Sequence, residues 1–150
     1  MTSRLSIGAL AALWLAASAG MVTVARAADD NKPAAAEEKP YVVKDGKVDQ
    51  HVYNGWRRYT ESCLRCHGPD GSGSSYAPAL IESLKSMSED QFKEVVVNGR
   101  KNVTTSAENV MPAFGEVEDV VSYLDDIYGY LKARSDGVVG RGRPERFEQK

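Results

Sequence analysis

This sequence has little cysteine and little histidine, and neither sign of charge is in large excess. The 150 residues include only two cysteines and two histidines, and 19 basic residues nearly balance 21 acidic ones. Two cysteines exclude a scaffold of several disulfides and a zinc site built from four thiolates. A formal net charge of −2 lacks the strongly basic footprint of a nucleic-acid-binding protein. The central question is therefore what the two cysteines do.

Charge is also absent from the stretch between Arg4 and Arg26. A basic residue, then an apolar run that ends in the small residues Ala25 and Ala27, is the layout of a secretory signal peptide. We expect residues 1–27 to be cleaved after Ala27, which leaves a soluble periplasmic chain without a membrane span. The alternative is an uncleaved anchoring helix, because an apolar run of about 20 residues can just cross a bilayer.

The remaining chain divides into three zones of different composition. Residues 28–47 are charged, rich in alanine and without helical periodicity, which predicts a flexible N-terminal leader. Residues 48–133 hold nearly all aromatic and periodic apolar residues and form the predicted domain. Residues 134–150 contain glycine, proline and more basic than acidic residues, which predicts an extended C-terminal tail. A domain this small often needs a staple, a metal or a cofactor to complete its core.

Helical periodicity within residues 48–133 predicts an all-α fold. A first helix carries an apolar stripe with spacings of four, three and four, formed by Val52, Trp56, Tyr59 and Cys63. A similar stripe over residues 117–131 predicts the last main helix. No alternating pattern of apolar and polar residues predicts a strand.

Capping signals predict a middle helix. Ser88 and Gln91 have the spacing of a capping box, and Asn98-Gly99 is a typical helix end. A short helix is expected over residues 81–87. Two long loops remain, and loops of this length in a small domain commonly wrap a ligand. They cover residues 67–80 and 100–115.

Both cysteines lie in the sequence Cys63-Leu64-Arg65-Cys66-His67. C-x-x-C-H is the attachment sequence of a c-type haem. Two thiols three residues apart on one helix face can both add to the haem vinyl groups. The histidine that follows then lies under the iron and supplies an imidazole nitrogen.

Three other uses of this motif fit the sequence less well. A thioredoxin-like dithiol does not need the histidine and belongs in a βαβ unit, which is not predicted here. A zinc site needs four ligands, and the exported chain offers only Cys63, Cys66, His67 and His51, two of them adjacent. A disulfide between cysteines separated by only two residues would be strained.

The residues around the motif make the chain similar to the class I cytochromes c. The shared pattern comprises Gly55, Tyr59, the C-x-x-C-H-Gly68 motif, Tyr76-Ala77-Pro78-Ala79-Leu80 and Met111-Pro112-Ala113-Phe114-Gly115. The resemblance implies the class I cytochrome c fold, in which three main helices, a short helix and long loops wrap around one covalent haem c. It also implies that Gly55 lets the first and last helices approach closely, with Tyr59 near Tyr123 and Leu124.

The same resemblance implies roles for the residues of the haem pocket. The two cysteines would form thioethers with the haem, and His67 would be one axial ligand of the iron. The Pro78 carbonyl would accept a hydrogen bond from the other nitrogen of His67, which fixes the ligand tautomer. Leu80 would line the haem. Tyr76 would either donate a hydrogen bond at the haem or cap its own loop.

The second axial ligand is expected from the second long loop. Met111 lies there beside Pro112, and a thioether suits a high-potential electron carrier because soft sulfur favours ferrous over ferric iron. The motif and the resemblance together favour Met111 as this ligand, although packing in the core is the ordinary role of a methionine. Met87 continues a helical stripe and is expected in the core, and His51 is expected to be exposed.

Two axial ligands leave no open position on the iron, so the sequence predicts a one-electron carrier and not an enzyme. Segments such as Y-N-G-W-R-R-Y and Y-L-D-D-I-Y-G-Y-L-K-A-R-S-D-G are similar to periplasmic cytochromes associated with quinoprotein (PQQ-dependent) alcohol and methanol dehydrogenases. That resemblance implies such a dehydrogenase as electron donor and a further cytochrome or terminal oxidase as acceptor. The alternatives are a general periplasmic or respiratory shuttle, an electron-transfer subunit of another oxidoreductase complex, and a gas-binding or catalytic haem protein.

Overall fold

Helices form the framework of residues 38–103 and 108–147, which are the residues that the structure, a computed structural model, describes. All of them belong to one unit, residues 36–150. The predicted signal peptide and the first half of the predicted leader, residues 28–37, lie outside the described residues. The helices are α1 (Gln50–Ser62), α2 (Leu64–His67), α3 (Leu80–Ser83), α4 (Glu89–Asn98), α5 (Glu118–Val121) and α6 (Leu124–Ser135), with a 3₁₀ turn η1 (Pro69–Gly71).

The first main helix, α1, begins after Asp49, whose buried carboxylate accepts a hydrogen bond from the Val52 N–H at 2.9 Å. An aspartate at this position satisfies a free N–H of the first turn and complements the helix dipole. Val52 and Tyr59 are buried, and Trp56 and Cys63 are half-buried. The predicted apolar stripe therefore faces the interior.

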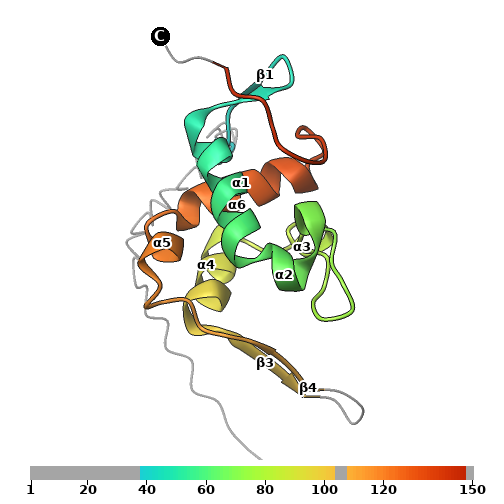
Figure 1. Cartoon of the computed structure of the whole chain (residues 1–150), viewed down its shortest axis with the longest axis vertical. Helices are drawn as coiled ribbons and strands as arrows, with labels where there is room; N and C mark the ends of the chain where they lie inside the picture. Colours follow the sequence, from blue (N-terminus) through green and yellow to red (C-terminus); the bar gives the residue numbers. More distant parts are fainter. Residues whose placement is uncertain (1–37, 104–107, 148–150) are drawn as a thin grey trace, which may run out of the picture. The chain divides into compact units, whose positions relative to one another are not determined.

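Helix α1 crosses α6 where Gly55 meets the backbone of Asp126 (Figure 1). A β-carbon at position 55 would lie 1.8 Å from the Asp126 carbonyl oxygen, so this close approach requires glycine. The Asp126 carboxylate also reaches back to α1, where it accepts a hydrogen bond from Asn54 at 3.2 Å and contacts His51 Nδ1 at 2.9 Å. The bond to Asp126 raises the pKa of His51.

The last helix of the sequence prediction is divided in the structure. Residues 117–131 were expected to form one helix, but α5 ends at Val121 and α6 starts at Leu124. Tyr123 adopts a non-helical conformation between them, and its ring lies 4.5 Å from the Arg58 guanidinium. Val120 and Leu124 are both buried, so the helical spacing of the apolar residues survives the break and did not reveal it.

The middle helix, α4, has the predicted capping box. Ser88 Oγ accepts a hydrogen bond from the Gln91 N–H at 3.2 Å, and Gln91 Oε1 accepts one from the Ser88 N–H at 3.0 Å. The helix ends at Gly99, which has a positive φ of 74°. The short helix α3 is shorter than predicted, because the chain leaves the helical form after Ser83.

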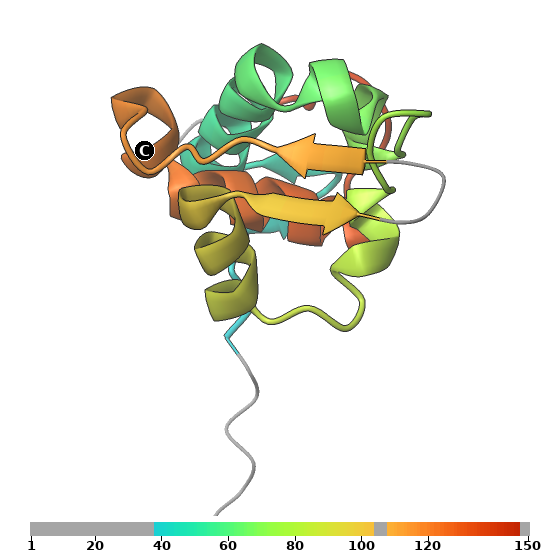
Figure 2. The ribbon, with the colours of Figure 1, turned by 90° about the horizontal axis from the view of Figure 1, so that it is seen from below.

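Two antiparallel hairpins occur where no strand was predicted. Strands β3 (Arg100–Val103) and β4 (Glu108–Met111) pair within the second long loop, with Arg100 opposite Met111 (Figure 2). Strands β1 (Val43–Lys44) and β2 (Lys47–Val48) pair just before α1. Each strand is at most four residues long, which is too short to show a convincing alternation in the sequence.

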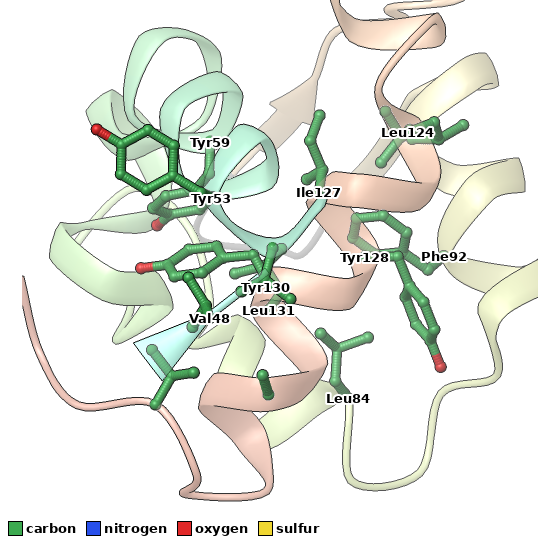
Figure 3. Close-up of a cluster of buried hydrophobic side chains, with 14 of the residues drawn as sticks. Val48, Tyr53, Tyr59, Leu84, Phe92, Leu124, Ile127, Tyr128, Tyr130 and Leu131 are labelled. Carbon is green, nitrogen blue, oxygen red and sulfur yellow. The ribbon is translucent and has the colours of Figure 1, made fainter. Parts of the chain in front are cut away.

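The core lies between α1, α4 and α6. Tyr130 of α6 lies near Tyr53 and Tyr59 of α1, whereas Tyr128 lies beside Phe92 of α4 (Figure 3). Several other side chains are almost fully buried around them, namely Val48, Val52, Leu84, Val120, Ile127 and Leu131. Among the described residues, no helix has both the length and the apolar character needed to span a membrane.

Candidate functional site

The C-x-x-C-H motif lies where α1 ends and α2 begins. Cys63 caps α1, with its N–H donating to the Tyr59 carbonyl at 2.8 Å, and its own carbonyl accepts hydrogen bonds from the N–H groups of Cys66 and His67. Both thiols are free, Cys63 half-buried and Cys66 exposed. Burial raises the pKa of Cys63 to about 11 in this thiol form. The tight turn thus presents two thiols and an imidazole from five consecutive residues.

His67 is buried, and one of its ring nitrogens is already engaged. Nδ1 lies 3.1 Å from the Pro78 carbonyl oxygen. A carbonyl only accepts, so Nδ1 carries the proton and Nε2 keeps the lone pair that can bind a metal. The Pro78 carbonyl therefore orients the ring and fixes the tautomer that a metal ligand needs.

The loop after His67 is held by two glycines in left-handed conformations. The Gly73 N–H donates to the His67 carbonyl at 2.7 Å. A β-carbon on Gly68 would lie 2.2 Å from the Gly73 carbonyl oxygen, and one on Gly73 would lie 2.7 Å from the Ala79 nitrogen. Both residues have positive φ, 72° and 82°. The loop is folded too tightly here for any side chain larger than hydrogen.

The Tyr59 hydroxyl fastens this loop from the interior. It donates to the Gly68 carbonyl at 2.5 Å and accepts from the Gly71 N–H at 2.9 Å. Burial raises the pKa of Tyr59 to about 12, so the phenol stays protonated and can donate. The ring packs 5.7 Å from that of Tyr130, and Figure 3 shows it apart from Leu124, beside which it was expected. The sequence reasoning missed the hydroxyl's role, because it treated Tyr59 only as a packing residue.

Met111 is the last residue of β4 and is half-buried against the core. Its backbone is held from two sides, since it pairs with Arg100 of β3 and its carbonyl oxygen lies close to Gly99, at 2.7 Å from where a β-carbon would be. The following residues join α4, with the Phe114 N–H donating to the Val96 carbonyl at 2.9 Å. The loop that was expected to be irregular thus presents Met111 from a short hairpin.

The two other ligand candidates lie elsewhere. His51 is in the first turn of α1, about 18 Å along the helix from Cys63 at 1.5 Å per residue, and Asp126 already holds its Nδ1. Met87 follows α3 and packs half-buried against the core. Neither residue lies on the β3–β4 hairpin that carries Met111.

The remaining predicted pocket residues lie around the same loop. Leu80 begins α3 and is half-buried against the core, whereas the Tyr76 side chain is 75 % exposed. Of the two roles left open for Tyr76, the loop cap is made by Ser74, a residue that the sequence did not single out. Ser74 Oγ donates to the Cys66 carbonyl at 2.5 Å and accepts from the Tyr76 N–H at 3.0 Å.

The donor set suits haem c better than a protein-only metal site. Two adjacent thiols can form thioethers, and a buried imidazole keeps one nitrogen for iron. A zinc site would need further protein ligands, and the described residues contain no cluster of three or more His, Cys, Asp or Glu arranged to hold a metal.

Comparison with known proteins agrees with this chemistry. Residues 50–131 match the family described as cytochrome C oxidase, cbb3-type, subunit III. The chain belongs to this cytochrome c family. It is a class I c-type cytochrome with covalent haem c, and Cys63 and Cys66 fit the attachment motif of that haem. Its relatives are cytochromes c, which agrees with the prediction of an electron-transfer protein. The helical class I fold predicted from the sequence is confirmed.

Individual relatives of this cytochrome share close to half of its residues over the aligned regions. It is 46 % identical over 100 residues to cytochrome c-555 of Methylococcus capsulatus, covering 66 % of this chain and 75 % of the relative. It is 48 % identical over 109 residues to cytochrome c-553I of Paracoccus denitrificans, covering 73 % of this chain and 48 % of the relative. The cytochrome thus spans about half the length of the Paracoccus protein.

A solved structure gives the same result. The c-type cytochrome XoxG from Methylobacterium extorquens AM1 superposes with a TM-score of 0.61 and 40 % sequence identity, covering 76 % of each chain. At this identity the likeness extends beyond the fold to the family.

Proposed function

We propose that His67 and Met111 are the axial ligands of the haem iron and that Pro78, Leu80 and Tyr76 border the haem. The observation that carries the first assignment is the 3.1 Å contact between His67 Nδ1 and the Pro78 carbonyl, which leaves Nε2 for iron. The position of Met111 on a paired strand that is also held at Gly99 and α4 supports the second.

The protein's own residues hold the haem and keep its ligands and the adjoining loop in fixed positions. The haem supplies reversible one-electron chemistry. The two cysteines anchor it covalently, and Pro78 keeps the imidazole of His67 in one tautomer and orientation. Tyr59 fixes the adjoining loop at Gly68 and Gly71. Rigid ligands keep reorganisation small when an electron arrives or leaves.

Replacement of Met111 by alanine tests the second ligand. We expect the thioether-to-ferric charge-transfer band to disappear and the midpoint potential to fall, because sulfur no longer stabilises ferrous iron. Met87→Ala is the matched control, since Met87 is also a half-buried methionine beside the core. Retention of the band in Met111→Ala together with its loss in Met87→Ala would transfer the ligand role to Met87.

We further propose that this cytochrome works in the periplasm, takes electrons from a quinoprotein alcohol or methanol dehydrogenase and passes them to a further cytochrome or terminal oxidase. The sequence resemblance around α1 and α6 carries this proposal. The similarity to the Methylococcus cytochrome and to XoxG supports it.

Stopped-flow mixing of the ferric cytochrome with an alcohol-reduced quinoprotein dehydrogenase tests the donor. We expect rapid haem reduction whose rate falls as the salt concentration rises, because charged surfaces guide such encounters. The same mixture without alcohol is the control. An absence of reduction at every salt concentration would favour a general periplasmic shuttle.

An electron-transfer subunit of another oxidoreductase complex is the second candidate. The matching family is described by an oxidase subunit, and the Paracoccus relative is about twice as long as the matched region. Co-purification from membranes with an oxidase, together with no reduction by the dehydrogenase, would favour this candidate.

A further inference from the structure

Residues 139–147, which we call the strap, pack against the start of the domain. Val139 is buried in the core. Val48 forms a parallel bridge with Arg146, its N–H donating to the Glu145 carbonyl at 2.8 Å and its carbonyl accepting from the Phe147 N–H at 3.0 Å. Figure 1 shows this segment, in red, beside β1 and the first turns of α1. The predicted extended tail is thus fixed at both ends in the described part.

Two arginines of the strap add contacts to α1. Arg143 donates to the Tyr53 hydroxyl and lies 5.5 Å from the Tyr53 ring and 5.8 Å from the Trp56 ring. Arg146 lies 4.8 Å from the Tyr53 ring. These contacts hold residues 143–147, the far half of the strap, against α1. A change at residues 139–142, its near half, therefore acts on a segment whose other end is held in place.

Asp70 joins the near half of the strap to the loop that follows His67. Its side chain is buried, with Oδ1 accepting the Gly142 N–H at 2.9 Å and Oδ2 lying 3.4 Å from Arg141 Nε. Its φ of 58° is left-handed, a conformation that aspartate and asparagine adopt more readily than other residues with a side chain.

Arg134 at the end of α6 makes a second link between the loop and the strap. Its Nε donates to the Asp70 carbonyl at 3.4 Å, and its Nη1 donates to the Val139 carbonyl at 2.6 Å. Both the backbone and the side chain of Asp70 are therefore held by groups that follow it by more than 60 residues.

The loop held by Asp70 reaches the imidazole through direct contacts. Gly73 hydrogen-bonds to the His67 carbonyl and packs against the Ala79 backbone. The neighbouring Pro78 carbonyl accepts the hydrogen bond from His67 Nδ1. A shift of the backbone between His67 and Gly73 would move both the chain that carries the imidazole and the carbonyl that orients it.

We propose that the strap positions the axial histidine of this cytochrome, and that Asp70 is the positioning residue through which it acts. The proposal rests on the axial ligation by His67 proposed above. Loss of the Asp70–Gly142 bond frees the loop, changes the orientation of the imidazole plane and shifts the midpoint potential, although Asp70 does not contact the iron.

Asp70→Gly in the full holoprotein tests the proposal, because glycine accepts the left-handed backbone and removes only the carboxylate. We expect the Gly142 amide to exchange its hydrogen at least tenfold faster. We also expect the haem-methyl NMR signals of the ferric protein, which report the imidazole orientation, to move. Asp70→Asn keeps an acceptor for Gly142. Its Gly142 exchange rate and its haem-methyl signals should therefore match those of the wild type.

Asp45→Gly is the matched control. Asp45 is also left-handed, with φ 50°, and its side chain has no hydrogen bond or ion pair to any described residue. This variant should leave the Gly142 exchange rate and the haem-methyl signals unchanged. Moved haem-methyl signals in Asp45→Gly would mean that they respond to general loosening, which would overturn the positioning role.

A chain that ends after Gly140 provides a second, independent variant, because it removes the Gly142 N–H and leaves Asp70 intact. It should move the haem-methyl signals in the same way, and Asp70→Gly should then add nothing. Unchanged haem-methyl signals in this chain, or a full additional effect of Asp70→Gly, would overturn the proposal. A failure of His67 ligation would be visible already in the wild-type ferric spectrum, so the two failures are distinguishable.

Discussion

At the scale of single residues, Tyr59 and Tyr130 have neighbouring rings but different hydroxyl environments. The Tyr59 hydroxyl makes two hydrogen bonds to the loop after the haem motif. The Tyr130 hydroxyl is buried and has no partner within hydrogen-bond distance among the described residues, although burial and the nearby Asp70 carboxylate raise its pKa. The two residues therefore separate the effect of a lost hydroxyl from the effect of its hydrogen bonds.

Tyr59→Phe should lower the free energy of unfolding by about 1–3 kcal/mol, because the Gly68 carbonyl and the Gly71 N–H lose their buried partner. Tyr130→Phe removes a polar group that has no partner, so it should be neutral or stabilising. Thermal or denaturant unfolding of the ferric protein measures both changes. Equal losses of stability in the two variants would contradict the role assigned to the Tyr59 hydroxyl.

The contacts of individual residues explain why the haem motif was easier to predict than the contacts that hold the loop after it. The motif from Cys63 to His67 is contiguous, so its chemistry could be read from the sequence. The Asp70–Gly142 bond joins residues 72 positions apart and uses a backbone N–H, which carries no residue signature. Tyr59 was recognised as part of the pattern, but its hydroxyl partners depend on the glycine conformations that the loop adopts.

At the scale of elements, the crossing of α1 and α6 depends on a contact that is polar as well as close. Gly55 touches the Asp126 backbone, and the Asp126 carboxylate contacts Asn54 and His51, which both precede Gly55 on α1. The crossing is thus fixed in register along α1 as well as in distance. A small residue alone would allow close approach but not this register.

Gly55→Ala should destabilise the folded protein by about 2 kcal/mol or more. Alanine favours a helix by about 1 kcal/mol relative to glycine, but its β-carbon would collide with the Asp126 carbonyl and force the helices apart. Gly140→Ala is the control, because a β-carbon there meets nothing within 4 Å. Thermal unfolding measures both, and a stabilised Gly55→Ala would show that the helices do not approach as described.

Elements with capping signals or long periodic stripes were predictable, and those determined by tertiary contacts were not. The start of α4 followed from Ser88 and Gln91. The break between α5 and α6 occurs at Tyr123, where Arg58 of another helix stacks on the ring. The strands β3 and β4 contain charged and amide residues with little apolar alternation, so their backbone pairing is not apparent from composition.

At the scale of the whole described unit, the first described residues pack against α6. Pro40 lies over Gly129, where a β-carbon would be 2.4 Å from the Pro40 carbonyl oxygen. Lys39 and Tyr41 both reach Asp136, the residue that caps the end of α6. The part of the predicted leader that the structure describes is therefore held against the domain, a contact that its charged composition did not indicate.

Asp136 should make the contact between residues 39–41 and the end of α6 sensitive to acid. Hydrogen bonds from Lys132, Tyr41 and Lys39 lower the pKa of the Asp136 carboxyl below its usual range. A carboxyl with a lowered folded-state pKa stabilises the protein fully above its unfolded-state pKa of about 3.9, and this contribution is lost as the pH falls through the folded value.

Asp136→Asn should therefore cost about 1 kcal/mol of unfolding free energy at pH 7, a modest value because Lys39 is largely exposed to solvent. The difference from wild type should begin to shrink below about pH 4, where the carboxyl of the unfolded wild-type chain takes up protons, and should go on shrinking as the pH falls toward the lowered folded-state pKa. Denaturant unfolding between pH 2 and pH 7 measures it, with Asp45→Asn as a control without side-chain partners among the described residues. The raised pKa of His51 acts in the opposite sense, stabilising below about 6.5 and fading as the pH rises, so it does not contribute to the acid limb. A difference between Asp136→Asn and wild type that stays constant down to pH 2 would contradict the assignment of the acid sensitivity to this carboxylate.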